Sequence, residues 1–179
     1  GFAKLLSACE DNLPADGMLG VAPHSLRAVT GAELAALVDM RKGVPVHIHA
    51  AEQLKEVDAS LAFLGARPVE WLLANAEVNV NWCLIHATHV TDAEIAALAA
   101  SGAVAGLCPV TEANLGDGIF PAVRYFEAGG RIATGTDSNI LIDPAQELRA
   151  LEYSQRLSHR ARNLLASDAI PSVGRSLFD

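Results

Sequence analysis

Two histidines and a glutamate stand close together in the segment VHIHAAE, where the pattern HxHxxE contains His47, His49 and Glu52. On an extended strand, His47 and His49 point to the same face because side chains alternate. His49, at the strand tip, could bind a divalent metal ion, and Glu52 could bend back above it to accept and return protons. The alternative is a pair of core histidines followed by a helix-capping glutamate. This motif alone does not decide between the two.

Two further strand ends carry residues of the same chemistry. His86 closes the strand in LIHATH, and Asp137 lies in the turn TGTDSN. Taken singly, His86 is more simply a structural histidine and Asp137 a turn or N-cap residue. Together with His49 and Glu52 they predict a metal site, with His49 as a candidate ligand, Glu52 and His86 in the chemistry, and Asp137 projecting over the site. His89 is expected to act as a cap or to support the site from behind.

Three other polar residues are candidates for binding a substrate. His24 and Arg27 lie in PHSLR, and Arg27 could form a bidentate pair with a carboxylate. A surface arginine that caps the helix below is an equal alternative. Glu112 lies in CPVTEANLGDG, a polar segment without helix or strand periodicity. Because long irregular connections are often functional, residues 108–118 are predicted to form a loop over the pocket.

These residues need a scaffold that brings strand ends together, and the rest of the sequence predicts one. Short, continuous apolar segments alternate with helical patterns, which is typical of a parallel sheet buried on both faces. The predicted strands are residues 18–22, 44–50, 82–87, 103–108 and 131–135. The predicted helices are residues 30–41 with a Thr30/Glu33 capping box, one that starts at Pro68, one from a Thr91/Glu94 capping box to Ser101, residues 119–128, one from Pro144 to about Leu157, and the start of another in residues 171–179.

Two α/β architectures fit this pattern, an open doubly wound sheet and a piece of a (β/α)8 barrel. The glycine-rich phosphate fingerprint of dinucleotide folds is missing after the first strand, which favours the barrel. A full barrel needs roughly 250 residues, whereas this chain has 179. The sequence therefore predicts a partial barrel, one catalytic domain over residues 1–179 that is truncated at both ends.

Composition limits the partners of the chain. The formal net charge is −8 and no basic run is present, so nucleic acid is not an expected partner. No apolar stretch approaches the roughly 18–20 residues that span a bilayer, so no membrane partner is expected either. Cys9, Cys83 and Cys108 form no CxxC pair, which is typical of reduced thiols in a cytoplasmic protein.

The order of the motifs, HxHxxE, a strand-end histidine, CPxxxxNLGxG and GTDS, resembles the metal-dependent deaminase branch of the amidohydrolase superfamily. The segments APHSLRAVT, VHIHAAEQ, LCPVTEANLGDGIFP and TGTDSNILID are similar to those of the formimidoylglutamate deiminases of histidine degradation. Glu112 is the most discriminating residue, since guanine and related deaminases usually have a Ser-Asn pair in that neighbourhood. The resemblance implies that the five predicted strands are strands four to eight of a TIM barrel.

The resemblance also implies a role for each residue. His49 matches the metal-ligand histidine after strand five, and Asp137 matches the ligand aspartate after strand eight, around one divalent ion that is expected to be zinc. Glu52 matches the proton-shuttling glutamate, and His86 matches the histidine after strand six. His24 and Arg27, after strand four, match the pair that approaches the carboxylates of the substrate.

The implied reaction is hydrolysis of N-formimidoyl-L-glutamate to N-formyl-L-glutamate and ammonia, by an enzyme that could be a homodimer when intact. The family's metal also needs an HxH pair from the first barrel strand, for which this chain has no strand. We therefore expect weak or no metal binding, and no activity, from the chain alone. Two alternatives stay open: another amidohydrolase that acts on guanine, a cytosine-like ring or a triazine, and a non-catalytic α/β module whose polar strand ends are caps.

Overall fold

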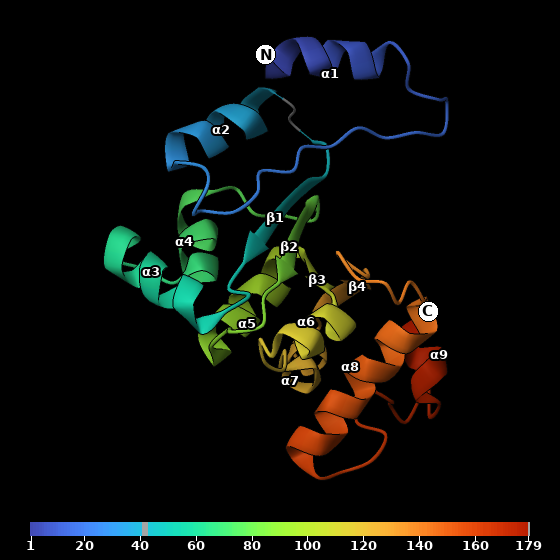
Figure 1. Cartoon of the computed structure of the whole chain (residues 1–179). Helices are drawn as coiled ribbons and strands as arrows, with labels where there is room; N and C mark the ends of the chain where they lie inside the picture. The colour runs from blue at the N-terminus through green and yellow to red at the C-terminus, as the bar shows by residue number, and fades with distance from the viewer. Residues whose placement is uncertain (41–42, 179) are drawn as a thin grey trace.

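The computed structural model describes residues 1–40 and 43–178 as a parallel β-sheet with helices packed along it (Figure 1). The strands lie in the order β1-β2-β3-β4, so each strand pairs with the next one along the chain. They are β1 (Val46–Ala50), β2 (Trp82–His86), β3 (Val104–Leu107) and β4 (Arg131–Thr134). The helices are α1 (Phe2–Glu10), α2 (Gly31–Met40), α3 (Leu54–Leu64), α4 (Pro68–Asn75), α5 (Asp92–Ser101), α6 (Pro109–Leu115), α7 (Ala122–Glu127), α8 (Pro144–His159) and α9 (Val173–Phe178).

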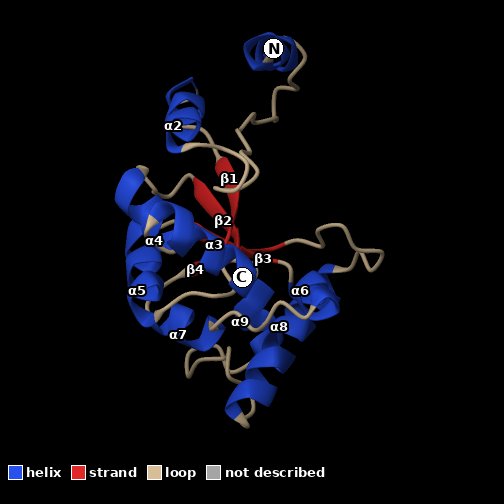
Figure 2. Cartoon of the chain, turned by 60° about the vertical axis from the view of Figure 1, so that its left-hand side comes forward, coloured by secondary structure: helices blue, strands red, loops and turns tan. Residues whose placement is uncertain are grey.

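The strands are apolar because helices cover one face of the sheet. Ile48, Leu84 and Ala105 lie opposite one another in register on that face, and all three are buried. Helices α3, α4, α5, α7 and α8 pack side by side in that order, which Figure 2 shows as an arc along the sheet. Every connection between consecutive strands contains at least one helix, as expected for the crossovers between parallel strands. The structure thus confirms the predicted α/β architecture.

The other face of the sheet is more open. His47, Cys83, Val104 and Arg131 lie in one row of the register, and the two residues at its ends are exposed. In a (β/α)8 barrel the helices form an outer ring and the opposite face of the strands lines the interior. The open face therefore corresponds to the wall of a barrel interior, as the prediction of a partial barrel requires.

The first predicted strand, residues 18–22, does not form a regular strand. The segment instead runs beside β1 through two isolated parallel bridges, from Val21 to Val46 and from Ser25 to His49. Pro23 lies between them and has no backbone N–H to donate, which interrupts the hydrogen-bond ladder. The segment still follows the edge of β1, so it delivers its residues to the same end of the sheet.

The two predicted capping boxes are confirmed. Thr91 Oγ1 accepts a hydrogen bond from the Glu94 N–H at 3.2 Å, and Glu94 Oε2 accepts one from the Thr91 N–H at 2.8 Å. Thr30 and Glu33 make the same reciprocal pair at the start of α2. Gly102, with φ 74°, ends α5 in the left-handed conformation that glycine adopts without steric cost.

Other boundaries agree less closely with the sequence. Helix α7 starts at Ala122, after the predicted position 119, and α8 extends past Leu157. The predicted ends of the first and last helices, Arg41 and Asp179, lie outside the described residues. Helices α1 and α3 were not predicted. Within the described residues, every helix is too short or too polar to cross a membrane.

The prediction of an irregular loop over residues 108–118 is wrong for its central part, which forms α6. Pro109 occupies the first turn, and Gly116, with φ 70°, follows the last helical residue. Proline at the start and glycine just past the end are the boundary signals of a helix. The seven residues of α6 are too few to show an apolar period, so these two signals were the only ones available.

Candidate active site

The predicted site residues gather where β1, β2 and β4 end, at the carboxyl edge of the sheet. Ala50, the last residue of β1, pairs with His86, the last residue of β2, so the two strand ends are level. The chain then leaves strand geometry abruptly, since Ala51 (φ 55°), His86 (φ 68°) and Asp137 (φ 53°) are left-handed. For non-glycine residues such a conformation costs about 1–3 kcal/mol and is often found at functional sites. Packing around the strand ends must therefore hold these residues in place.

The backbone conformation of His86 turns its side chain into the site. In a regular strand it would face the same side as Leu84, which is buried under the helices. Its Nε2 atom instead lies 3.7 Å from Glu52 Oε1 and 3.6 Å from Asp137 Oδ2. The structure therefore brings these three predicted residues around one point, with His86 only 1% exposed.

The ring of His49 stands beside that of His86, with the ring centroids 5.7 Å apart. His49 Nδ1 lies 2.7 Å from the carbonyl oxygen of His24. A carbonyl oxygen only accepts hydrogen bonds, so Nδ1 must be the donor, and in the neutral ring Nε2 then keeps a lone pair. Metal-binding histidines commonly donate their other ring N–H to such a carbonyl, which fixes the ring. His49 thus fits the role of a metal ligand.

A second set of possible metal ligands includes a cysteine. Donor atoms of His86, Cys108 and Asp137 all lie within 4.8 Å of one another, and this set differs from the predicted pair of His49 and Asp137. Burial, reinforced by the charge of Glu112, raises the pKa of the Cys108 thiol to about 12. Because the thiolate is the form that binds metals, the protonated thiol is a weak ligand at neutral pH. We therefore favour the imidazole and carboxylate donors, which suit zinc.

The Glu52 carboxylate and the His86 imidazole shift each other's pKa. Burial raises the pKa of Glu52, and the nearby charge of Asp117 adds to this effect, while His86 opposes it. Burial also disfavours the charged ring of His86. The hydrogen bond with Glu112 and the charges of Glu52 and Asp137 outweigh that effect and raise the pKa of His86. A carboxyl group and an imidazole that lie this close together in a buried site, each with a perturbed pKa, are candidates for moving protons during a reaction.

Glu112, which was predicted to contact the substrate, lies behind His86. It is 4% exposed, its Oε1 accepts the Cys108 N–H at 2.9 Å, and the same oxygen lies 3.2 Å from His86 Nδ1. The short helix α6 carries it into this position. These contacts are with the protein itself, and the contact with the substrate that was expected from the sequence stays a prediction.

Glu56 supports the site in a way that the sequence analysis missed. Its carboxylate accepts the N–H of Ala51 at 3.0 Å and that of Glu52 at 2.9 Å, and its side chain is buried. Glu56 therefore holds the turn that carries Glu52. The available signal was an acidic residue in the first turn of a helix, from which a carboxylate can reach back to N–H groups that precede the helix.

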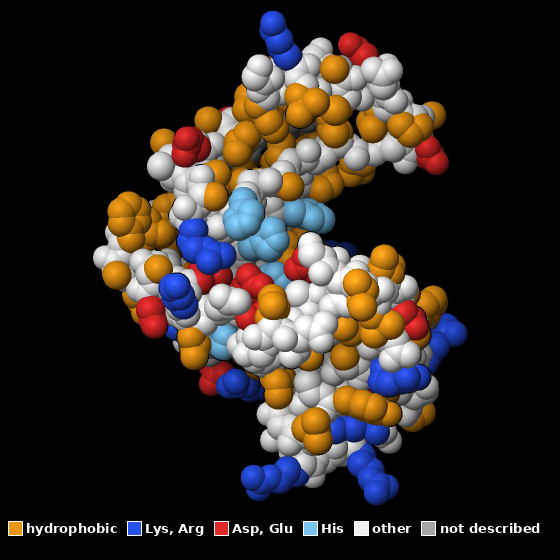
Figure 3. Space-filling model, in the orientation of Figure 1, with side chains coloured by type: hydrophobic (Ala, Val, Ile, Leu, Met, Phe, Trp, Pro, Cys, Tyr) orange, Lys and Arg blue, Asp and Glu red, His pale blue; other side chains and the backbone are white. Residues whose placement is uncertain are grey.

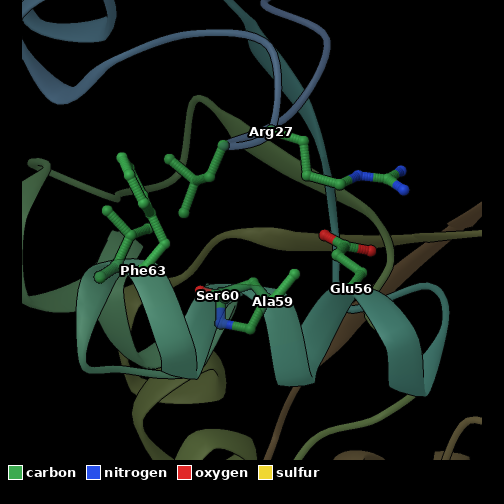
Figure 4. Close-up of a pocket in the computed structure, with 8 residues that line it drawn as sticks. Arg27, Glu56, Ala59, Ser60 and Phe63 are labelled. Atoms are coloured by element: carbon green, nitrogen blue, oxygen red, sulfur yellow. The ribbon is translucent and has the colours of Figure 1, made fainter.

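The predicted substrate-binding pair lies beside this cluster. The exposed ring of His24 stacks against His49, with ring centroids 4.9 Å apart. Arg27, farther along the same segment, lines a cavity of about 300 Å³ between this segment and α3, together with Glu56 and Phe63. Figure 4 shows Arg27 extending on the side of the cavity where Glu56 lies. The structure thus brings His24 into the histidine cluster and places Arg27 at the adjoining cavity.

The cluster is open to solvent on one side. Figure 3 shows histidine side chains gathered beside acidic ones where this face of the molecule is hollowed. His89 stands apart from the cluster, because its Nε2 bonds the carbonyl oxygen of Asp117 at 2.8 Å. That contact agrees with the supporting role that was predicted for His89.

Comparisons with known proteins show which family this chain belongs to. A model of the amidohydrolase family matches residues 4–172. The chain is 51% identical to a formimidoylglutamate deiminase of Pseudomonas aeruginosa, over 99% of this chain and 40% of that protein. It superposes on the crystal structure of an amidohydrolase from Brucella melitensis with a TM-score of 0.95 and 56% identity, over 99% of this chain and 40% of the other. An adenosine deaminase from Xanthomonas campestris with bound zinc gives a TM-score of 0.78 and 29% identity, over 89% of this chain and 38% of the other. The chain thus spans about 40% of the length of these relatives.

Proposed function

The chain belongs to the amidohydrolase family, and we propose that it is the C-terminal part of the catalytic barrel of a formimidoylglutamate deiminase. The observation that carries the proposal is the position of His86 Nε2 between the carboxylates of Glu52 and Asp137. The 51% identity to the Pseudomonas aeruginosa deiminase supports the choice of substrate within the family.

The proposed substrate is N-formimidoyl-L-glutamate. Water adds to the formimidoyl carbon, and the bond from that carbon to the terminal nitrogen breaks. The products are ammonia and N-formyl-L-glutamate. His49 and Asp137 would hold one divalent metal ion, expected to be zinc, together with ligands from outside this chain. Such an ion, when bound, would lower the pKa of water to about 7 and so supply a nucleophile at neutral pH.

The residues of this chain move the protons. Glu52 accepts a proton from the attacking water and delivers it to the terminal nitrogen, a task that its raised pKa suits. The remaining hydroxyl proton of the adduct then passes to the same nitrogen, which leaves as ammonia while the C=O bond forms. Asp137 accepts a hydrogen bond from the same water. His86, with Nε2 between these two carboxylates, stabilises the attacking water or the tetrahedral adduct.

His24 and Arg27 are proposed to bind the carboxylates of the substrate. Arg27 is exposed, and its guanidinium forms no ion pair with any residue in 1–40 or 43–178. Its planar N–H donors are therefore available for bidentate recognition of a carboxylate. Anchoring a group far from the reacting carbon fixes the orientation of the substrate.

A chimera tests this proposal. This chain would replace the matching segment of the Pseudomonas aeruginosa deiminase, and ammonia release from N-formimidoyl-L-glutamate would be measured. We expect the chimera to be active and the chain alone to be inactive. Analogues that lack one carboxylate should be hydrolysed with a lower kcat/KM, and Arg27→Ala should reduce that difference.

The same assay separates the alternatives. A chimera that deaminates adenosine or guanine, and leaves N-formimidoyl-L-glutamate intact, would support another deaminase of the family. A folded chimera with neither activity nor bound metal would support a non-catalytic module. Circular dichroism of the chimera and of the unmodified deiminase provides the folding control.

A further inference from the structure

The Glu112 carboxylate contacts other residues of the protein, Cys108 and His86. The residue is 4% exposed and contacts His86, which is 1% exposed. One oxygen, Oε1, accepts the Cys108 N–H at 2.9 Å and lies 3.2 Å from His86 Nδ1. A buried carboxylate so placed acts on the ring beside it.

The chemistry of the two groups determines which of them donates in the contact between Glu112 and His86. A carboxylate only accepts hydrogen bonds, so the Nδ1 of His86 must be the donor. When the ring is neutral, its proton is therefore on Nδ1, and Nε2 is left with a lone pair. That lone pair faces the point between Glu52 and Asp137, where Nε2 lies 3.7 Å and 3.6 Å from their oxygens.

The surroundings of Nε2 favour the opposite tautomer. Two carboxylates near Nε2 would attract a proton to that nitrogen, which would then present an N–H to the site in place of a lone pair. Glu112, on the other side of the ring, favours the proton on Nδ1. Among the residues that the structure describes, the Nδ1–H tautomer of His86 therefore depends on this buried carboxylate.

Glu112 itself is held firmly. Helix α6 is tied to α8 by the Val110 N–H, which donates to Glu147 Oε2 at 2.9 Å. It is tied to the segment that follows β4 by the Thr111 hydroxyl, which donates to the Thr136 carbonyl at 3.0 Å. The element that orients His86 is therefore also bonded to the residue that precedes Asp137.

We propose that Glu112 is a positioning residue, which selects the Nδ1–H tautomer of His86 and so presents the Nε2 lone pair to the reaction site. The structural part stands on the contacts above. Its catalytic consequence rests on the proposed deiminase function. The residue acts through His86, without touching the substrate.

Nitrogen NMR of the histidine rings tests the structural part on this chain directly. The spectra are recorded at a pH where the His86 ring is neutral, and its signals are assigned by their loss in His86→Gln. We expect the Nδ1–H tautomer in the unmodified chain. A spectrum of the unmodified chain that shows Nε2–H overturns the proposal, whatever the variants do.

Two substitutions sharpen the test. Glu112→Ala removes the acceptor, so His86 should shift to the Nε2–H tautomer; retention of Nδ1–H contradicts the proposal. Glu112→Gln keeps an acceptor oxygen and should keep Nδ1–H, and this variant decides the question if Glu112→Ala does not fold. Glu127→Ala, at an exposed glutamate on α7, should leave the His86 signals unchanged.

Kinetics of the chimera test the catalytic consequence. Glu112→Ala should lower kcat by about 10–100-fold, the usual effect of removing a partner that orients an active-site group, with a smaller change in KM. Glu112→Gln should restore most of that loss. A higher KM at unchanged kcat would instead indicate a direct substrate contact and overturn the proposal. If the chimera has no activity at all, the proposed function fails while the NMR result still decides the tautomer.

Discussion

Glu56 anchors the turn between β1 and α3, and its removal should weaken both the fold and the position of Glu52. The carboxylate accepts two backbone N–H groups, from Ala51 at 3.0 Å and from Glu52 at 2.9 Å. Ala51 has φ 55°, so the turn includes an unfavourable backbone conformation that these bonds hold in place. Glu56→Ala leaves both N–H groups without their acceptor.

The size of the effect follows from the burial of the two donors. A buried donor that loses its partner costs about 1–3 kcal/mol. The bond to Ala51 is buried, whereas the N–H of Glu52 is partly exposed and can turn to water. We therefore expect Glu56→Ala to lower the free energy of unfolding by about 2–4 kcal/mol, a large part of a typical total of about 5–15 kcal/mol. Glu56→Gln should lose about half as much, because its amide oxygen still accepts one N–H.

Urea unfolding, followed by the fluorescence of the buried Trp82, measures these differences. Glu127→Ala is the matched control, since Glu127 is exposed and its loss should change stability by less than about 0.5 kcal/mol. If Glu56→Ala unfolds at the same urea concentration as the control, the two hydrogen bonds do not hold the turn. The explanation of how Glu52 is positioned would then be wrong.

Three further measurements probe other parts of the structure. Calorimetric titration of zinc into the chain alone should show weak or no binding, because only two of the expected ligands are present; tight stoichiometric uptake would contradict this. Gly130→Ala should destabilise the chain by about 1–3 kcal/mol in urea, because an added Cβ would overlap the buried ring of Tyr125, whereas Gly174→Ala has no atom within 4 Å and should be neutral or slightly stabilising. Burial raises the pKa of Glu147 above 4.5, so the contribution of its protonated form to stability is complete below pH 4.5 and is lost as the pH rises through the folded-state pKa. Glu147→Gln should therefore gain stability relative to the unmodified chain as the pH rises from 4.5 to 7, and a constant difference would show that this group does not titrate as described.

Local signals in the sequence were sufficient where a few neighbouring residues decide the structure. The Thr91/Glu94 capping box requires only two side chains and two N–H groups within one turn, and it formed as predicted. The parallel strands were likewise predictable, because short, continuous apolar segments are typical of strands in a sheet that is buried on both faces. These features fixed the order of the strand ends, and hence the residues that could meet there.

The orientation of His86 could not be predicted in this way. Strand alternation directs its side chain toward the helices, and only its left-handed backbone, φ 68°, turns it to Glu52 and Asp137. That conformation is maintained by packing around the strand end, including contacts with Glu112 from a distant part of the chain. Such contacts depend on the tertiary structure, and a single sequence does not show them.

The same reason explains the difference at Glu112. From the sequence, Glu112 was predicted to lie in an irregular loop over the pocket and therefore to contact the substrate. Pro109 and Gly116 delimit a short helix there, and this helix carries Glu112 to the far side of His86. Recognising these two helix boundaries would have predicted α6, but the direction of its side chains depends on α8 and β4.

The central claim is that Glu52, His86 and Asp137 converge to move protons beside a bound metal. Glu52→Gln in the chimera tests it most directly, with metal content and kcat measured on the same preparation. We predict that the variant keeps the metal of the parent chimera and loses about 10²–10⁴-fold in kcat, the typical contribution of a general acid–base group. A variant that retains full turnover would remove Glu52 from the reaction and contradict the account.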